Sequence, residues 1–334
     1  MQMIQTRRRF LAGLSGIGAA AMLRTPSLAG EAPAETTLVR LAKSTGICGA
    51  PEHIVDDLLR TEGFSEIQHV SLARPINTPD AIARGEIDFG LNYAHALVAG
   101  IDHGVAMKTL LGVHVGCFEV FVHDAIRGVA ELAGKKVGIS AIGSPEHLFL
   151  SLIAANVGID PKIQIDWVTS GSAHPKQLFI DGKIDAFLGF PPEPQELRAR
   201  GIGRTVVNSA VDRPWSQYFC CMLAGSADYV ENRPVATKRV VRAILKATDL
   251  CASEPARAAR MLVDGGYTPR FDYALQTLKE LPYDKWRDYD AEDTMRFYTL
   301  RLHDVGFVRS SPQKIIADGT DWRFLNELKR ELKT

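Results

Sequence analysis

The 334-residue chain has few cysteines, no excess of positive charge and no composition typical of a polytopic membrane protein. Its five cysteines are too few and too scattered for a disulfide framework at this length. Lys and Arg total 39 and Asp and Glu total 39, so there is no basic excess to neutralise a phosphate backbone, and nucleic-acid binding is not expected. With 46% hydrophobic and 23% charged residues, the composition is that of a globular protein.

Motifs of catalysis and of metal binding are missing as well. The sequence has no Gly-x-Ser-x-Gly elbow, no phosphate-binding loop with Gly-Lys-Ser/Thr and no His-Glu-x-x-His helix. Its nine histidines, Cys48 and Cys117 do not recur at the close spacing that places two ligands on one helix face. The sequence therefore predicts no enzymatic activity, no metal site and no cofactor.

The N-terminus has the features of an export signal. Arg7, Arg8 and Arg9 precede an uncharged, weakly hydrophobic run from Phe10 to Leu23. Those 14 residues would rise about 21 Å as a helix, too short for a hydrocarbon core of ~30 Å. The small residues of 27–29 offer a cleavage site, and the paired arginines resemble a twin-arginine signal. We therefore expect residues 1–29 to be a signal peptide, with export to the periplasm by the twin-arginine route.

Removal of this segment changes the charge of the protein only slightly. It takes away four arginines and no acid, which leaves 35 basic and 39 acidic residues. The segment contains no cysteine, so a lipid anchor on the mature N-terminus is not expected. We expect a mildly acidic, soluble mature protein without a stable membrane anchor.

The mature chain begins with alternating strand and helix patterns and ends with helices alone. Strand-like runs are at 39–42, 67–72, 87–91, 136–139, 163–168 and 184–188, and helical patterns at 51–61 and 145–157. This alternation predicts βαβ units and mainly parallel sheet. Five further helices are expected in a C-terminal helical tail, at 236–251, 255–263, 271–281, 291–302 and 322–332.

Two stretches of the chain repeat the same plan. Residues 39–53 and 137–147 each contain a strand, a glycine-containing loop and the sequence Pro-Glu-His at a helix start. A second matched pair, 84–91 and 181–188, follows at nearly the same offset. Two lobes of one plan are therefore predicted. Their loops would face each other at the carboxyl ends of strands, where ligands bind in open α/β sheets. The helix starts there would suit an anionic group, although ordinary turns satisfied by caps and water remain an alternative.

Three motifs resemble a family of transport proteins. They are Ala83–Gly90, Val129–Gly138 and Gly182–Ala186, in the order and spacing of periplasmic solute-binding proteins of the nitrate, sulfonate, taurine and thiamine-pyrimidine-precursor group. Glu131 stands where that family more often has Asp. The resemblance implies an α/β, type II-like fold of two lobes with a helical C-terminal tail. It places lobe 1 at 37–123 plus 222–334 and lobe 2 at 124–221.

The same resemblance implies a function and partners. Such proteins capture a small solute between their lobes and deliver it to an ABC permease and ATPase complex in the membrane. We expect a monomer. An enzyme on this scaffold, acting on a pyrimidine or a sulfonate, and a sensory ligand-binding module are the alternatives. A fungal enzyme of this group carries a Cys-Cys-Cys-Phe-Cys run, but only Phe219, Cys220 and Cys221 match it here, so no enzymatic role is transferred. The vicinal cysteines could form a disulfide or be small apolar residues of a buried strand.

The predicted ligand-binding residues lie in four segments, each just after a predicted strand. They are Ser44, Thr45, Gly46 and Ile47; Asn92 and Tyr93; Ser140, Ile142, Gly143 and Ser144; and Phe190 and Glu193. Tyr93 and Phe190 could hold a flat ligand between them, or could pack between the lobes without one. Glu193 would favour a cationic ligand, which competes with the anionic one. His53 and His147 could bind ligand or the opposite lobe, and Trp215 could line the cleft or fill the hinge.

Overall fold

The computed structural model describes residues 31–43, 46–72, 77–170 and 174–332. Internal contacts divide the chain into residues 1–32 and a unit from Pro33 to Thr334, and both sheets belong to the second unit. The predicted signal peptide, 1–29, and the predicted site residues Ser44 and Thr45 lie outside the described residues. In the part of the chain that the structure describes, no helix is both long enough and apolar enough to cross a membrane.

Two five-stranded sheets share one strand order. The first runs β2-β1-β3-β10-β4 and the second runs β7-β6-β8-β5-β9. The strands of the first sheet are β1 (Leu38–Lys43), β2 (Glu66–Ser71), β3 (Phe89–Tyr93), β4 (Met107–Val115) and β10 (Phe219–Ser226). Those of the second are β5 (Glu119–Val122), β6 (Lys136–Ile139), β7 (Asp166–Thr169), β8 (Ala186–Gly189) and β9 (Arg204–Asn208). The predicted α/β fold of two similarly built lobes is confirmed.

Each sheet has four strands in one direction and one strand that opposes them, so the expectation of mainly parallel sheet is confirmed. Strand β1 is parallel to β2 and β3, but β10 is antiparallel to β3 and β4. In the second sheet β6 is parallel to β7 and β8, and β5 is antiparallel to β8 and β9. The opposing strand of each sheet is the first one after the chain crosses between the lobes. After β4 the chain crosses to the second sheet and forms β5, and after β9 it returns to the first sheet and forms β10. Each of these two strands runs against the other four strands of its sheet.

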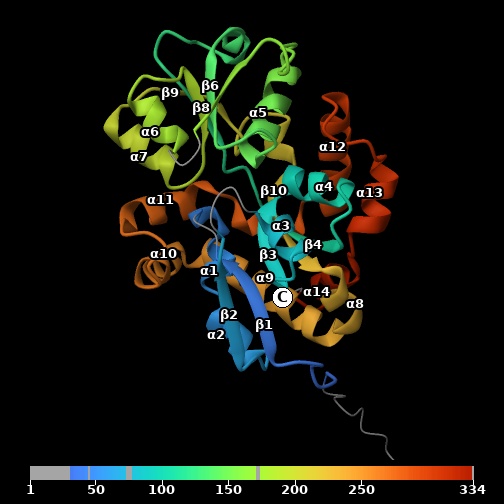
Figure 1. Ribbon diagram of the computed structural model, residues 1–334. Helices are drawn as coiled ribbons and strands as arrows, with labels where there is room; N and C mark the ends of the chain where they lie inside the picture. The colour runs from blue at the N-terminus through green and yellow to red at the C-terminus, as the bar shows by residue number, and fades with distance from the viewer. Residues whose placement is uncertain (1–30, 44–45, 73–76, 171–173, 333–334) are drawn as a thin grey trace, which may run out of the picture. The chain divides into compact units, whose positions relative to one another are not determined.

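Helices cover both sheets (Figure 1). The first sheet carries α1 (Ala50–His53), α2 (Asp56–Thr61), α3 (Thr78–Ala83) and α4 (Ala94–Asp102), and the short helix η1 (Ile47–Gly49) precedes α1. The second carries η2 (Val129–Leu132), α5 (Pro145–Asn156), α6 (Pro175–Ile180) and α7 (Glu193–Arg200). The single helix expected at 51–61 is thus two helices, and the β-branched residues Ile54 and Val55 lie at the break.

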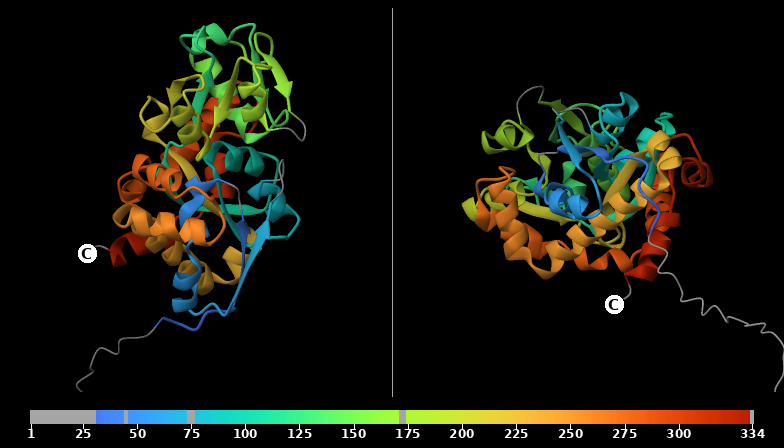
Figure 2. Two further views of the ribbon diagram at one scale, coloured as in Figure 1. Left: turned by 90° about the vertical axis from the view of Figure 1, so that its left-hand side faces the viewer. Right: turned by 90° about the horizontal axis from the view of Figure 1, so that it is seen from below.

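The C-terminal region is helical, as predicted. After η3 (Trp215–Gln217) and β10 it contains α8 (Ala227–Asn232), α9 (Pro234–Ser253), α10 (Pro255–Asp264), α11 (Phe271–Glu280), η4 (Tyr283–Arg287), α12 (Ala291–Asp304), α13 (Pro312–Gly319) and α14 (Arg323–Glu331). Strand β4 contacts α9, η4, α13 and α14, so these helices cover the first sheet and form one lobe with it (orange to red in Figure 2). The second sheet with α5, α6 and α7 forms the other lobe.

The chain crosses between the lobes at 116–118 and at 209–218. Because β5 belongs to the second sheet and β10 starts at Phe219 in the first, both crossings lie a few residues earlier than the boundaries expected at 123/124 and 221/222. The Ser209 hydroxyl joins the two crossings, since it accepts hydrogen bonds from the backbone amides of Cys117 (3.1 Å) and Phe118 (2.9 Å). Gly116 has a positive φ of 62° beside Ala210.

Candidate functional site

The first predicted loop contacts the last one across the two lobes. The backbone amide of Ile47 donates a hydrogen bond to the Pro191 carbonyl at 3.3 Å. Gly46 is close to the second lobe, because a Cβ built on it would lie 3.5 Å from the Phe190 ring. These residues follow β1, the second strand of the first sheet, and β8, the third strand of the second sheet. Gly46 and Ile47 thus meet Phe190 and Pro191, and not the loop at 140–144 that the repeat matches with theirs.

The other two predicted segments also meet across the lobes. His95 lies in the first turn of α4, just after Asn92 and Tyr93. The distance between its Nε2 and the carbonyl oxygen of Pro145, the first residue of α5, is 3.0 Å. His95 is buried, which lowers its pKa to about 4, because burial penalises the charged imidazolium. The His95 ring is therefore neutral, and it donates a hydrogen bond from Nε2 to the Pro145 carbonyl. His95 was not predicted, although it lies within one turn of the strand end that predicted Asn92.

Asn92 and Tyr93 make local contacts at this strand end. The side-chain oxygen of Asn92 accepts a hydrogen bond from the Tyr93 amide at 2.7 Å. The half-buried Tyr93 ring lies 4.5 Å from that of Phe118, between ring centroids. Phe190 is buried. That Tyr93 and Phe190 hold a flat ligand between them stays a prediction.

Hydrogen bonds within residues 140–147 hold the loop before α5 in place. Ser144 is the N-cap, and its hydroxyl accepts from the His147 amide at 3.3 Å. The Ser140 hydroxyl donates to Glu146 at 3.2 Å, and the Gly143 amide donates to Nδ1 of His147 at 3.0 Å. Ile142, which is 63% exposed, and Gly143 are the exposed members of this loop. The hydroxyls of Ser140 and Ser144 and the ring of His147 therefore fix the shape of this loop.

Glu193 has a structural role in the turn after β8. Its carboxylate accepts a hydrogen bond from the Phe190 amide at 3.3 Å and lies 3.0 Å from Nε2 of His174. Glu193 is buried. Because these contacts hold the carboxylate against its own lobe, they give no support to its predicted role with a cationic ligand.

Both histidines of the Pro-Glu-His sequences bond within their own lobes, and the His147 ring also packs edge-on against Phe307 of the C-terminal helical region, 5.3 Å between centroids. Nε2 of His53 is 3.0 Å from the Gly46 carbonyl, and its ring stacks on Tyr267 at 4.1 Å between centroids. Burial lowers the pKa of His53 to about 4. Glu52, fully buried, accepts from the Leu91 amide at 3.1 Å, and its burial raises its pKa well above the usual range. Like the bond from Gly143 to His147, these contacts fix the shape of the strand-to-helix loops.

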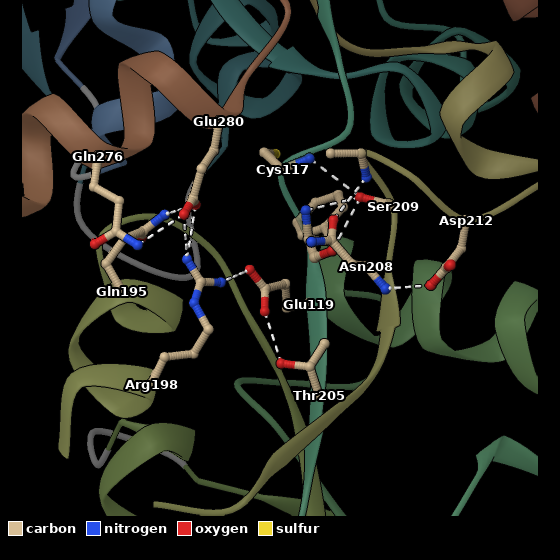
Figure 3. A network of polar contacts seen from close by, with 12 residues as sticks. Cys117, Glu119, Gln195, Arg198, Thr205, Asn208, Ser209, Asp212, Gln276 and Glu280 are labelled. Carbon is tan, nitrogen blue, oxygen red and sulfur yellow. Dashed lines mark hydrogen bonds and ion pairs between the residues drawn. The ribbon is translucent and has the colours of Figure 1, made fainter. Parts of the chain in front are cut away.

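Away from these loops the lobes are also joined by polar contacts, which Figure 3 shows, and by aromatic contacts. The Arg198 guanidinium of α7 bonds to Glu119 of β5 and to Glu280 of α11, the latter at 2.7 Å. Gln195 donates to the same Glu280 at 2.9 Å. Trp215 is buried and packs on Phe149 of α5 and Phe297 of α12, so it fills the space beside the second crossing.

Buried cysteines gather next to the first loop. Cys48 on η1 lies near Cys117 of the first crossing and Cys221 of β10, and each of them is buried. The five cysteines of the chain all have free thiols, so the disulfide considered for Cys220 and Cys221 is not formed. Spacing along the sequence does not bring these residues together, because they come from three separate elements.

The chain matches a known family over most of its folded unit. Residues 56–263 match the model of the NMT1-like family. The chain belongs to the NMT1-like family. Among curated proteins it is similar to the Saccharomyces cerevisiae 4-amino-5-hydroxymethyl-2-methylpyrimidine phosphate synthase THI12, at 24% identity over 66% of this chain and 69% of that protein. The related synthase THI5 of the same yeast is 24% identical over 64% of this chain and 67% of its own length.

Solved structures share the fold of this NMT1-like protein. The periplasmic nitrate-binding protein NrtA from Synechocystis PCC 6803 superimposes with a TM-score of 0.75 at 15% identity, over 90% of each chain. The alkanesulfonate-binding protein SsuA from Xanthomonas axonopodis pv. citri, bound to MOPS, gives 0.70 at 16% identity, over 83% of this chain and 96% of that one. The two-lobe periplasmic binding-protein fold expected from the sequence is therefore confirmed.

Proposed function

We propose that this NMT1-like protein is the exported solute-binding subunit of an ABC importer. The observation that carries the proposal is that four loops, two from each sheet, contact one another in pairs. Ile47 bonds to Pro191 in one pair, and His95 bonds to Pro145 in the other. Each loop follows a strand at the edge of the sheet where α/β proteins bind ligands. A solute held there would touch both lobes and favour their approach over their separation.

The proposed site consists of the residues predicted from the sequence. We assign the solute to the loops with Ser44, Thr45, Gly46, Ile47, Asn92, Tyr93, Ser140, Ile142, Gly143, Ser144, Phe190 and Glu193. The solute class is a sulfonate, an aromatic acid or a pyrimidine-like molecule. The exposed residues Ile142 and Gly143 come just before the N-terminus of α5, and a helix N-terminus favours a ligand with acceptor oxygens. Half-buried Tyr93, at the end of β3, offers apolar ring surface.

The proposal includes a location and partners. Export by the twin-arginine route would place the protein in the periplasm as a monomer, where it meets an ABC permease and ATPase complex. The fold of NrtA and SsuA, both named as binding proteins, supports this role. An enzyme on the same scaffold is the second candidate, since the yeast relatives are named as synthases. Recovery of unaltered solute after incubation with the protein distinguishes binding from catalysis.

The first experiment is a thermal-unfolding screen with sulfonates, nitrate, aromatic acids and pyrimidine precursors. A solute at 100 times its dissociation constant stabilises the folded state by about 2.7 kcal/mol. We expect one chemical class to raise the unfolding temperature and to be recovered unchanged. No shift with any of these classes would contradict the proposal, and conversion of the solute would favour the enzyme.

A matched pair of variants tests the site. Ser144 and Ser311 are both N-caps whose hydroxyl accepts from the third helical amide at 3.3 Å. Ser144→Ala and Ser311→Ala should each lose about 1 kcal/mol of stability. Only Ser144→Ala should also weaken solute binding, because only Ser144 lies in the proposed site. Equal affinity in the two variants would remove the α5 loop from the site.

A further inference from the structure

Five soft metal-ligand side chains gather at the junction of the first loop with the two crossings. They are Cys48 on η1, His114 on β4, Cys117 on the first crossing, and Cys220 and Cys221 at the start of β10. Every one of them is at most 4% exposed. Within the described residues, the donor atoms of Cys48, His114 and Cys221 lie within 4.8 Å of one another, and so do those of Cys117, Cys220 and Cys221.

The register of the first sheet explains why these residues meet. Cys221 is paired with His114 on β4 and with Tyr93 on β3. Residues directly opposite one another in neighbouring strands project on the same face, so His114 and Cys221 share a face. A register shift between Phe219 and Cys221 leaves Cys220 outside the regular pairing, and its Sγ lies 3.0 Å from that of Cys117.

His114 has the hydrogen bonding of a metal ligand. Its Nδ1 is 2.8 Å from the Gly116 carbonyl oxygen, which can only accept, so a neutral ring carries its proton on Nδ1. Nε2 then carries a lone pair, and it has no hydrogen-bond partner among the described residues although the side chain is fully buried. Histidines that ligate metals commonly donate their other ring N–H to a carbonyl or carboxylate in this way.

The distances fit a small tetrahedral ion. Zinc–sulfur bonds are about 2.3 Å, so two thiolates on one tetrahedral ion lie roughly 3.8 Å apart. The two sets of donor atoms, each within 4.8 Å, share Cys221, and the Cys117 thiol is also within hydrogen-bonding reach of Cys48. Small side-chain rotations would bring Cys48, His114, Cys117 and Cys221 around one ion. Sulfur-rich sites with one imidazole select Zn(II) or Cu(I) over hard cations such as Mg²⁺. The two ions share this ligand chemistry.

We propose that this cluster binds one thiophilic d¹⁰ cation, Zn(II) or Cu(I), through the thiolates of Cys48, Cys117 and Cys221 and the imidazole of His114. Cys220 lies beside this set and is available as an alternative thiolate. The ion would fasten the first loop to β4, to β10 and to a crossing between the lobes. Binding releases the thiol protons, because the ligands are thiolates. The proposal is independent of which solute the protein binds.

The test uses the full-length protein, reduced and freed of metal by a chelator. It is titrated separately with Zn(II) and with Cu(I) against a competing chelator, and with Co(II) as a spectroscopic probe. We expect one equivalent to bind and Co(II) to give sulfur-to-metal charge-transfer absorption. Bound metal should also raise the unfolding temperature.

Variants identify the ligands. Cys221→Ser and Cys48→Ser should each weaken Zn(II) or Cu(I) binding by about 100-fold or more. Cys251→Ser is the matched control, since Cys251 is equally buried but lies on α9 outside the cluster. If Cys221→Ser does not fold, the stoichiometry and the Co(II) spectrum of the unaltered protein still decide. The absence of stoichiometric binding, unchanged binding in a folded Cys221→Ser variant, or a Cys117–Cys220 disulfide in place of metal would overturn the proposal.

Discussion

Gly116 at the first crossing gives the sharpest stability prediction. Its φ is 62°, in the left-handed region, and a Cβ built on it would lie 2.2 Å from the Cα of Ala210 and 2.4 Å from its amide nitrogen. Both atoms belong to the backbone of the second crossing, so they cannot rotate away as a side chain would. Gly116→Ala therefore has to push the two crossings apart.

The expected cost has two parts. A non-glycine residue in the left-handed region costs roughly 1–2 kcal/mol. Steric overpacking against fixed neighbours costs about 1–3 kcal/mol more. We expect Gly116→Ala to lower the free energy of unfolding by about 2–5 kcal/mol. The strain should also loosen the hydrogen bonds from the amides of Cys117 and Phe118 to the Ser209 hydroxyl, because these join the same crossings.

Gly201→Ala separates the two parts. Gly201 has almost the same φ, 63°, but a Cβ there would meet nothing within 4 Å. Urea unfolding followed by tryptophan fluorescence should show a loss of about 1–2 kcal/mol for Gly201→Ala and a clearly larger loss for Gly116→Ala. Equal losses in the two variants would refute the close approach of the crossings.

Two further predictions concern buried polar groups near the lobe contacts. The pKa of His95 is lowered to about 4 in the folded protein against 6.5 ordinarily, so the stability that its neutral ring provides is complete above pH 6.5 and is lost as the pH falls towards 4, by up to about 3 kcal/mol. His95→Gln should make the unfolding free energy less dependent on pH in that window, although buried His53, whose pKa is also lowered to about 4, keeps its own contribution. A dependence as steep as in the unaltered protein would contradict the assignment. The buried hydroxyl of Tyr283 donates to the Cys48 carbonyl at 2.8 Å. Tyr283→Phe should cost about 1–3 kcal/mol in urea unfolding, because it leaves that carbonyl unpaired, and a cost near zero would show that the bond is replaced.

The sequence was sufficient for the elements with strong periodicity. Helices α9, α10, α11, α12 and α14 of the tail were predicted because apolar residues recur in them at helical spacing, whereas the short helices α8 and α13 were not predicted. The Pro-Glu-His repeat correctly indicated two lobes of one plan, since the same local turn occurs after β1 and after β6. Strands β4 and β5 were not predicted, because nearly every residue in them is buried and no alternating pattern marks them.

The candidate loops could be predicted, but their contacts could not. A strand end followed by a helix start identifies Asn92 and Ser144 as members of a possible site. The pairing of Ile47 with Pro191 and of His95 with Pro145 depends on how the lobes pack, which local pattern does not encode. For the same reason the sequence did not indicate that Glu193 accepts a hydrogen bond from the Phe190 amide of its own turn, and its role with a ligand stays a prediction.

The amino-acid sequence by itself determined the class of fold, the repeat and the four loops, because these depend on residues that are neighbours along the chain. The tertiary structure alone decided the exchange of β5 and β10 between the sheets and the meeting of Cys48, His114 and Cys221. Those outcomes join residues up to about 170 positions apart, through strand register and burial. Only the folded chain brings such residues into contact.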